Sequence, residues 1–174
     1  MVVVLSGPVH GGKTTFLERA LARWRALGRA CDGFLSVAAA DADGARAYDL
    51  VELIGGLRRP YLRRSGEPGA ERVGPYVFVP EALERARAIL RGAAPDGLLV
   101  VDEAGPLELE GRGLWPALRE AAARPGPTLV VAREECAAAA AAALGPAPVP
   151  VVDIREPAAA DRLEALLFGR GGSS

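Results

Sequence analysis

Residues 7–14, GPVHGGKT, have the residue types and spacing of a glycine-rich phosphate-binding loop, GxxxxGK[S/T]. The glycines let the backbone turn tightly, so that its N–H groups can point at phosphate oxygens. Lys13 would reach the β- and γ-phosphates of a nucleotide, and Thr14 would offer its hydroxyl to Mg²⁺. We therefore expect the phosphates to contact a run of consecutive residues: Gly7, Pro8, Val9, His10, Gly11, Gly12, Lys13, Thr14 and Thr15.

Lys13 is the only lysine of the chain, although lysine and arginine together number 21. Arginine thus supplies positive charge wherever a generic cation is enough. A compact ammonium fits between phosphates inside a tight loop, whereas the wide planar guanidinium of arginine does not. The one lysine therefore stands where this chemistry requires it, and we count Lys13 among the catalytic residues.

A second set of residues follows the apolar segment LLVV at 98–101, which Asp102 and Glu103 terminate. Ligands of open α/β sheets bind beyond the carboxyl ends of the strands, so these acids are expected at the same site as the loop. Asp102 would hold Mg²⁺ together with Thr14. Glu103 would polarise a water molecule for attack on the γ-phosphate.

Two basic residues near the predicted site have open roles. Arg133 follows the apolar segment TLVVA and either neutralises charge that develops on the γ-phosphate or is a surface arginine at a helix start. His10, the only histidine, occupies a loop position on which the motif makes no demand. It either contacts a phosphate or the base, or it faces solvent.

Buried apolar segments alternate with helical patterns along the chain, which predicts a parallel sheet covered by helices on both faces. A strand at 2–6 precedes a helix at 13–27 that Gly28 ends. The turn signal DADG separates two strand patterns and predicts a β-hairpin. The expected fold class is a three-layer α/β/α arrangement with a mostly parallel sheet and this hairpin inserted. Further strands and helices are predicted in GPYVFV and from Pro80, in DGLLVVDEAGPLEL, GRGLWPALREAAARPG, PTLVVAREECAAAAAAALG and VPVVDI, and in PAAADRLEALLFG.

Residues 55–72 are rich in Gly, Pro and Arg and are predicted to form a long loop. Three roles stay open for the arginines of this segment: a lid over the phosphates, a contact with nucleic acid, or a solvated surface. These arginines surround Tyr61 in the sequence and are Arg58, Arg59, Arg63 and Arg64.

Length and composition fit one domain at 1–168 with a flexible tail at 169–174. Half of the 174 residues are apolar, and the net charge of −1 creates no field that would attract nucleic acid or an anionic membrane. No apolar segment reaches the roughly 18 residues that a membrane span needs, and no signal peptide is recognised, so we expect a soluble cytoplasmic protein. Cys31 and Cys136 are interpreted as ordinary thiols.

The chain resembles a small family of P-loop nucleoside-triphosphatases that includes a thermostable bacterial and archaeal enzyme and the cancer-related nucleoside triphosphatase. The resemblance rests on VVVLSGPVHGGKTT, GFLSV, DGARAYDLV, VGPYVFVPEALE and VDEAGPLEL and covers nearly all of residues 1–168. Val37 and Ala38 stand where the family often carries an acid. The resemblance implies a RecA-like P-loop fold, Mg²⁺-dependent hydrolysis of ATP, GTP and other nucleoside triphosphates to diphosphate and phosphate, and roles for Lys13, Thr14, Asp102, Glu103 and Glu108.

Two other functions use the same loop and stay open at this point. The first is a small-molecule or nucleotide kinase in which residues 55–72 close over an acceptor. The second is a nucleotide-dependent sensor that binds without turnover. A Ras-like GTPase is excluded because its guanine-reading Asn-Lys-x-Asp motif is impossible in a chain with no Asn and only one Lys. A dinucleotide dehydrogenase is disfavoured because GxGxxG does not follow the first strand.

Overall fold

The computed structural model of the chain describes residues 1–145 and 148–169, so residues 170–174 of the predicted tail lie outside the described residues. Its strands are β1 (Val2–Gly7), β2 (Cys31–Ala40), β3 (Arg46–Glu52), β4 (Arg58–Arg63), β5 (Arg72–Val73), β6 (Tyr76–Phe78), β7 (Leu98–Ala104), β8 (Thr128–Arg133) and β9 (Val151–Asp153). Its helices are α1 (Lys13–Ala26), α2 (Pro80–Gly92), α3 (Pro106–Leu109), α4 (Trp115–Ala122), α5 (Glu134–Leu144) and α6 (Ala159–Phe168).

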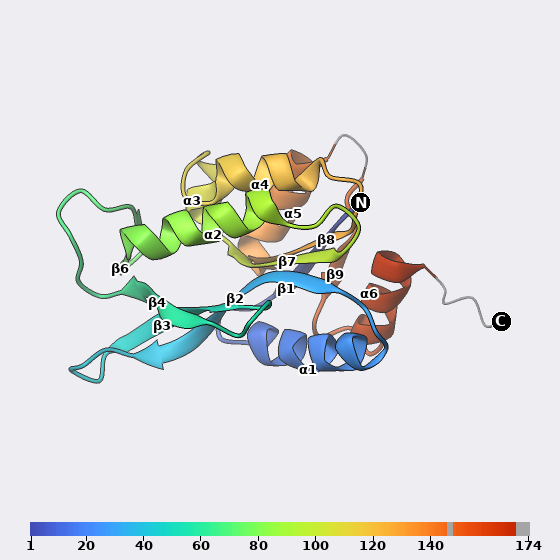
Figure 1. Cartoon of the computed structure of the whole chain (residues 1–174), viewed down its shortest axis with the longest axis horizontal. Helices are drawn as coiled ribbons and strands as arrows, with labels where there is room; N and C mark the ends of the chain where they lie inside the picture. Colours follow the sequence, from blue (N-terminus) through green and yellow to red (C-terminus); the bar gives the residue numbers. More distant parts are fainter. Residues whose placement is uncertain (146–147, 170–174) are drawn as a thin grey trace.

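All described strands join one sheet in the order β5-β6-β4-β3-β2-β7-β8-β1-β9. Within it, β2, β7, β8, β1 and β9 are parallel neighbours. Helices α1 and α6 cover one face of this parallel part, and the other helices cover the opposite face (Figure 1). Every residue of β1 is buried, because both of its faces are covered. The predicted three-layer fold is confirmed.

The strand order places the sequence-predicted residues at one edge of the sheet. Strand β8 lies between β1 and β7, and all three run in the same direction. The loop after β1, Arg133 at the end of β8 and the two acids of β7 therefore meet at the carboxyl edge. The acids of β7 and Arg133, about 90 and 120 positions further along the sequence, thus become neighbours of the loop.

Two apolar clusters fix the layers on either side of the sheet. Helix α1 buries Leu17, Leu21 and Trp24, whose spacing places them on one helix face, against β1 and α6. Trp24 is 1% exposed and meets the ring of Phe168 edge-on, with 5.4 Å between the centroids. Burial of one such large side chain contributes about 1.5–3 kcal/mol to folding. The cluster therefore anchors the helix that begins at Lys13.

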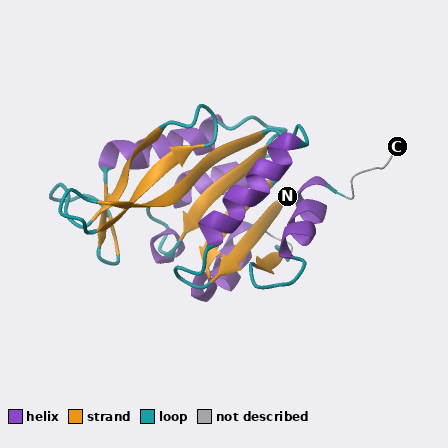
Figure 2. Cartoon of the chain, turned by 90° about the horizontal axis from the view of Figure 1, so that it is seen from below, coloured by secondary structure: helices purple, strands orange, loops and turns teal. Residues whose placement is uncertain are grey.

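The predicted hairpin is confirmed, and it is part of a larger antiparallel extension. Strands β2 and β3 pair from Phe34 opposite Glu52 to Ala40 opposite Arg46. Strands β4, β6 and β5 add further antiparallel pairs and extend the sheet at one end (Figures 1 and 2).

The prediction of a long loop at 55–72 is wrong, because β4 and the first residue of β5 lie inside it. Tyr61 is 3% exposed and belongs to the apolar cluster on the face of the sheet that α2, α3, α4 and α5 cover, rather than to a surface. Ion pairs with acids of β3 and with Asp41, just after β2, hold the arginines of β4 in the sheet. Arg58 Nε lies 2.8 Å from Asp49, Arg59 Nη2 lies 2.8 Å from Glu52, and Arg63 Nε lies 2.8 Å from Asp41. Arginines in this pairing do not form a mobile lid.

Within residues 1–145 and 148–169, none of the helices combines the length and the apolar character that crossing a membrane requires.

Candidate active site

The phosphate-binding loop connects β1 to α1. Its backbone adopts a conformation that few residue types other than glycine tolerate. Gly12 precedes the helix with φ of 85°, and His10 has φ of 59°. A Cβ atom on Gly11 would lie 2.6 Å from Pro8 Cγ, which is too close for any side chain. No side chain in the described part of the chain caps the start of α1. Its first N–H groups are therefore available to an anion.

Lys13 folds back over the loop instead of reaching into solvent. Its ammonium donates to the carbonyl oxygens of Gly7 at 3.2 Å and Pro8 at 3.1 Å. The Lys13 side chain is only 7% exposed, and its Nζ lies 3.6 Å from Glu103 Oε2. Carbonyl oxygens bind an ammonium more weakly than the charged oxygens of a phosphate do. Lys13 is thus held close to the place where β- and γ-phosphates would bind.

Thr14 and Asp102 meet across the site although 88 positions separate them in the sequence. Thr14 Oγ1 donates to Asp102 Oδ2 at 3.0 Å, and the backbone N–H of Ser36 donates to the same oxygen at 3.3 Å. Asp102 is 2% exposed. Burial, and then the charge of Glu103, raise the pKa of Asp102 to about 7, while Thr14, Ser36 and Lys13 act in the opposite direction.

The Thr14–Asp102 pair is the donor set that suits Mg²⁺. This ion prefers oxygen ligands and is usually held by one or two protein groups together with substrate phosphates and water. No group of three or more His, Cys, Asp or Glu that could hold a metal occurs among the described residues. A buried carboxylate whose ionisation is suppressed would be stabilised in its charged form by a divalent cation. The residues present therefore fit Mg²⁺ delivered with a nucleotide.

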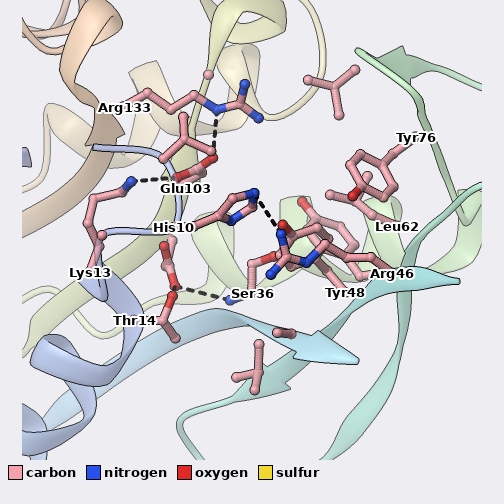
Figure 3. A pocket seen from close by; sticks show the side chains of 18 of the residues that line it. His10, Lys13, Thr14, Ser36, Arg46, Tyr48, Leu62, Tyr76, Glu103 and Arg133 are labelled. Carbon is pink, nitrogen blue, oxygen red and sulfur yellow. Dashed lines mark hydrogen bonds and ion pairs between the residues drawn. The ribbon is translucent and has the colours of Figure 1, made fainter. Parts of the chain in front are cut away.

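Glu103 lies between two cations, as Figure 3 shows. Arg133 Nε donates to Glu103 Oε1 at 3.0 Å, and Lys13 faces the other carboxylate oxygen. The Glu103 side chain is 28% exposed, so solvent reaches it. Of the two roles left open for Arg133, this contact favours the one at the site rather than a plain surface arginine.

The structure places Glu108 beside the cavity but gives it a structural role. It is 3% exposed and accepts hydrogen bonds from the backbone N–H groups of Gly105 at 2.8 Å and Leu114 at 3.1 Å. Burial raises the pKa of Glu108. Both carboxylate oxygens are thus engaged in fixing the turn that follows β7.

These residues line a cavity of about 320 Å³ that continues from the phosphate-binding loop to the antiparallel extension. Val9 and the loop residues up to Thr15 line it, whereas Gly7 and Pro8 contribute through their carbonyl contacts with Lys13. The loop and the extension also touch directly. Arg46 Nη1 lies 2.7 Å from His10 Nε2 (Figure 3). Because a guanidinium can only donate, His10 Nε2 is the acceptor of this hydrogen bond.

A model of the family described as NTPase matches residues 2–156 of the chain. The chain belongs to this NTPase family. The NTPase is 33% identical over 134 residues to the cancer-related nucleoside-triphosphatase homolog of Bos taurus, covering 71% of this chain and 70% of the relative. It is 32% identical over 133 residues to the nucleoside-triphosphatase THEP1 of Methanopyrus kandleri, covering 76% of this chain and 73% of the relative.

Two solved structures share the fold of the NTPase. The crystal structure of THEP1 from Aquifex aeolicus superposes with a TM-score of 0.72 at 18% identity, covering 97% of this chain and 99% of that one. The solution structure of a human cancer-related nucleoside triphosphatase superposes with a TM-score of 0.69 at 26% identity, covering 99% of this chain and 98% of that one. These comparisons confirm three predictions: the family, the fold, and the enzyme class, a nucleoside-triphosphate hydrolase.

Sequence reasoning on this NTPase missed the half of the cavity that the antiparallel extension builds. Ser36 supplies a backbone N–H to Asp102, and Arg46, Tyr48 and Tyr76 line the cavity wall. No local motif marks these residues, because strand register rather than spacing brings them to the loop. The family resemblance rests in part on GFLSV, DGARAYDLV and VGPYV, which carry these residues and were the available signal.

Proposed function

We propose that the protein hydrolyses ATP, GTP and other nucleoside triphosphates to the diphosphate and phosphate, with Mg²⁺ as cofactor. The observation that carries the proposal is the convergence of the loop with β7. Lys13 lies 3.6 Å from Glu103, and Thr14 lies 3.0 Å from Asp102. A basic group for phosphate, an oxygen pair for a cation and a carboxylate for water thus occupy one solvent-accessible cavity.

In the proposed complex, Thr14 and Asp102 hold the cation, and the loop N–H groups hold the phosphate oxygens. When bound, Mg²⁺ supplies positive charge that screens the phosphates and stabilises the charge of the leaving diphosphate. Phosphate oxygens compete better than carbonyl oxygens for Lys13, so the ammonium turns from Gly7 and Pro8 towards the β- and γ-phosphates.

The same competition prepares Glu103 for its role. In the structure its two oxygens face Lys13 and Arg133. Once phosphate oxygens draw these cations away, the carboxylate accepts a hydrogen bond from water instead. The water oxygen then bonds to the γ-phosphorus, the bond from this phosphorus to the bridging oxygen breaks, and Glu103 accepts the proton. Arg133 offsets charge on the terminal phosphate.

The experiment is phosphate release from ATP, GTP, CTP and UTP, with Mg²⁺ or with EDTA, by the wild type and Lys13→Ala. We expect Mg²⁺-dependent release from several nucleotides. Lys13→Ala should weaken triphosphate binding and abolish turnover, because the charge at the β- and γ-phosphates is lost. Arg119→Ala, which removes an exposed cation from α4, is the matched control. Turnover of Lys13→Ala at the wild-type rate would exclude this site as the place of hydrolysis.

A further inference from the structure

The cavity has an aromatic part to which the proposed hydrolysis assigns no role. It is built by the antiparallel extension, and we call it the hairpin end: Val37, Tyr48, Leu62, Val73, Tyr76 and Phe78. The rings of Tyr48 and Tyr76 stand edge to face, with centroids 5.3 Å apart and an interplanar angle of 80°. Both side chains are half-buried and line the cavity. The guanidinium of Arg64 also lies over the Tyr76 ring, 5.0 Å from its centroid. Aromatic walls of this kind favour a flat ring as their ligand.

The order of the strands shows on which side of Glu103 the hairpin end lies. Strand β7, which carries Glu103, stands between β1 with the phosphate-binding loop and the strands β3, β4 and β6 of the hairpin end. In Figure 3, Lys13 and the tyrosines lie on opposite sides of Glu103. In an in-line displacement the attacking group approaches the γ-phosphorus opposite the leaving diphosphate. With the diphosphate on the loop, the hairpin end faces the attacking side.

Arg46 adds a positive charge between the hairpin end and the loop. Its hydrogen-bond partner in the described part of the chain is the imidazole of His10, at 2.7 Å, and no carboxylate there pairs with it. The arginines of β4 differ, because Arg58, Arg59 and Arg63 are each paired with an acid. An exposed guanidinium at the cavity wall is suited to a bidentate contact with phosphate.

We infer that the hairpin end binds a second small molecule of the nucleoside monophosphate class, which receives the terminal phosphoryl group. Its base would lie against Tyr48 and Tyr76, and its phosphate would face Arg46. An oxygen of this phosphate forms the new bond to the γ-phosphorus, and the bond from that phosphorus to the bridging oxygen breaks. The electron pair stays with the departing diphosphate. No proton has to move, since the attacking oxygen is already ionised at neutral pH. The inference rests on the proposed function, because it uses the same bound triphosphate.

The test follows the label of γ-³²P-ATP into phosphate or into a nucleoside diphosphate, with AMP, GMP, CMP or UMP added. Wild type is compared with Tyr76→Leu, which removes the ring and keeps an apolar side chain, and with Tyr76→Phe, which keeps the ring. Arg46→Ala is compared with Arg58→Ala, which removes an arginine that does not line the cavity. Urea unfolding of each variant establishes that it is folded.

We expect labelled diphosphate from wild type with at least one monophosphate. The ratio of transfer to hydrolysis should fall about tenfold in Tyr76→Leu and in Arg46→Ala. It should stay at the wild-type value in Tyr76→Phe and Arg58→Ala. Phosphate as the sole product with every monophosphate would overturn the inference and leave the proposed function standing. A higher KM for ATP alone in Tyr76→Leu, with kcat unchanged, would assign the hairpin end to the nucleobase and overturn it too. Absence of both products would refute the proposed function itself.

Discussion

Asp102 is almost fully buried, and it lies next to a second acid, Glu103. Its hydrogen bonds come from Thr14 and Ser36, which are neutral groups. Its pKa of about 7, against 3.8 for a free aspartate, means that ionisation in the folded state is unfavourable. A residue that is costly to ionise without a ligand is suited to bind a cation.

Asp102→Asn should therefore stabilise the protein without nucleotide or divalent cation at pH 8, and much less at pH 5. The folded pKa of Asp102 is raised, so the stability that its protonated form provides is present below the unfolded pKa. This stability is lost as the pH rises through 7. At about 1.4 kcal/mol per pKa unit, the gain at pH 8 is on the order of 2–4 kcal/mol. Urea unfolding in EDTA at both pH values measures it.

Asp96→Asn, which changes an exposed aspartate, is the matched control and should alter stability little at either pH. A destabilised Asp102→Asn at pH 8, or a gain of the same size at pH 5, would contradict the account of Asp102.

At the scale of elements, the site depends on turns that hold the ends of the strands in place. The segment after β7 turns sharply through α3, and Glu108 binds N–H groups on both sides of that turn. The N–H of Gly113, in the same connection, donates to Glu71 at 2.9 Å. These contacts tie the antiparallel extension to the segment that follows Asp102 and Glu103.

Glu108→Ala should leave two buried N–H groups without partners and lower the free energy of unfolding by about 2–5 kcal/mol. Urea unfolding at pH 7 measures the change. Glu110→Ala, two residues along the chain and exposed, should change the stability by less than about 0.5 kcal/mol. Equal effects of the two substitutions would show that Glu108 does not hold this turn.

The elements also show what sequence reasoning could and could not find. The phosphate-binding loop and the acids of β7 were predictable, because their chemistry resides in consecutive residues after buried strands. Strand β4 was not, because its Gly, Pro and Arg content is typical of loops. It forms a strand because Arg59 and Arg63 meet acids on the neighbouring chain segments. Tyr48 and Tyr76 were missed for the same reason, since only the antiparallel register brings their rings together.

At the scale of the whole molecule, the parallel part carries the glycine-rich loop and the acids of β7 that we propose to act on phosphate, and ion pairs fasten the antiparallel extension. Glu52 is the centre of one such group and is 6% exposed. It accepts hydrogen bonds from Arg85 Nε at 3.0 Å and Arg59 Nη2 at 2.8 Å. The hydrogen bonds from Arg85, and then the charges of both arginines, lower the pKa of Glu52 against the opposing effect of burial.

Glu52→Gln should consequently weaken the protein most at neutral pH and make its stability less sensitive to acid. Because the folded pKa is lowered, the stability that ionised Glu52 provides is present above its unfolded pKa. That stability is lost as the pH falls below about 4.5. We expect a loss of about 1–3 kcal/mol at pH 7 that shrinks towards pH 3, measured by urea unfolding. A loss that grows in acid would contradict this role.

We propose that Glu103 orients the attacking water, and single-turnover phosphate release from saturating Mg²⁺–ATP measures this role. Glu103→Gln keeps the size of the side chain and removes its basicity, while Glu120→Gln makes the same change on the exposed face of α4. We expect a 10²–10⁴-fold slower release in Glu103→Gln, with nucleotide affinity retained and with Glu120→Gln unaffected. Release at the wild-type rate in Glu103→Gln would contradict it.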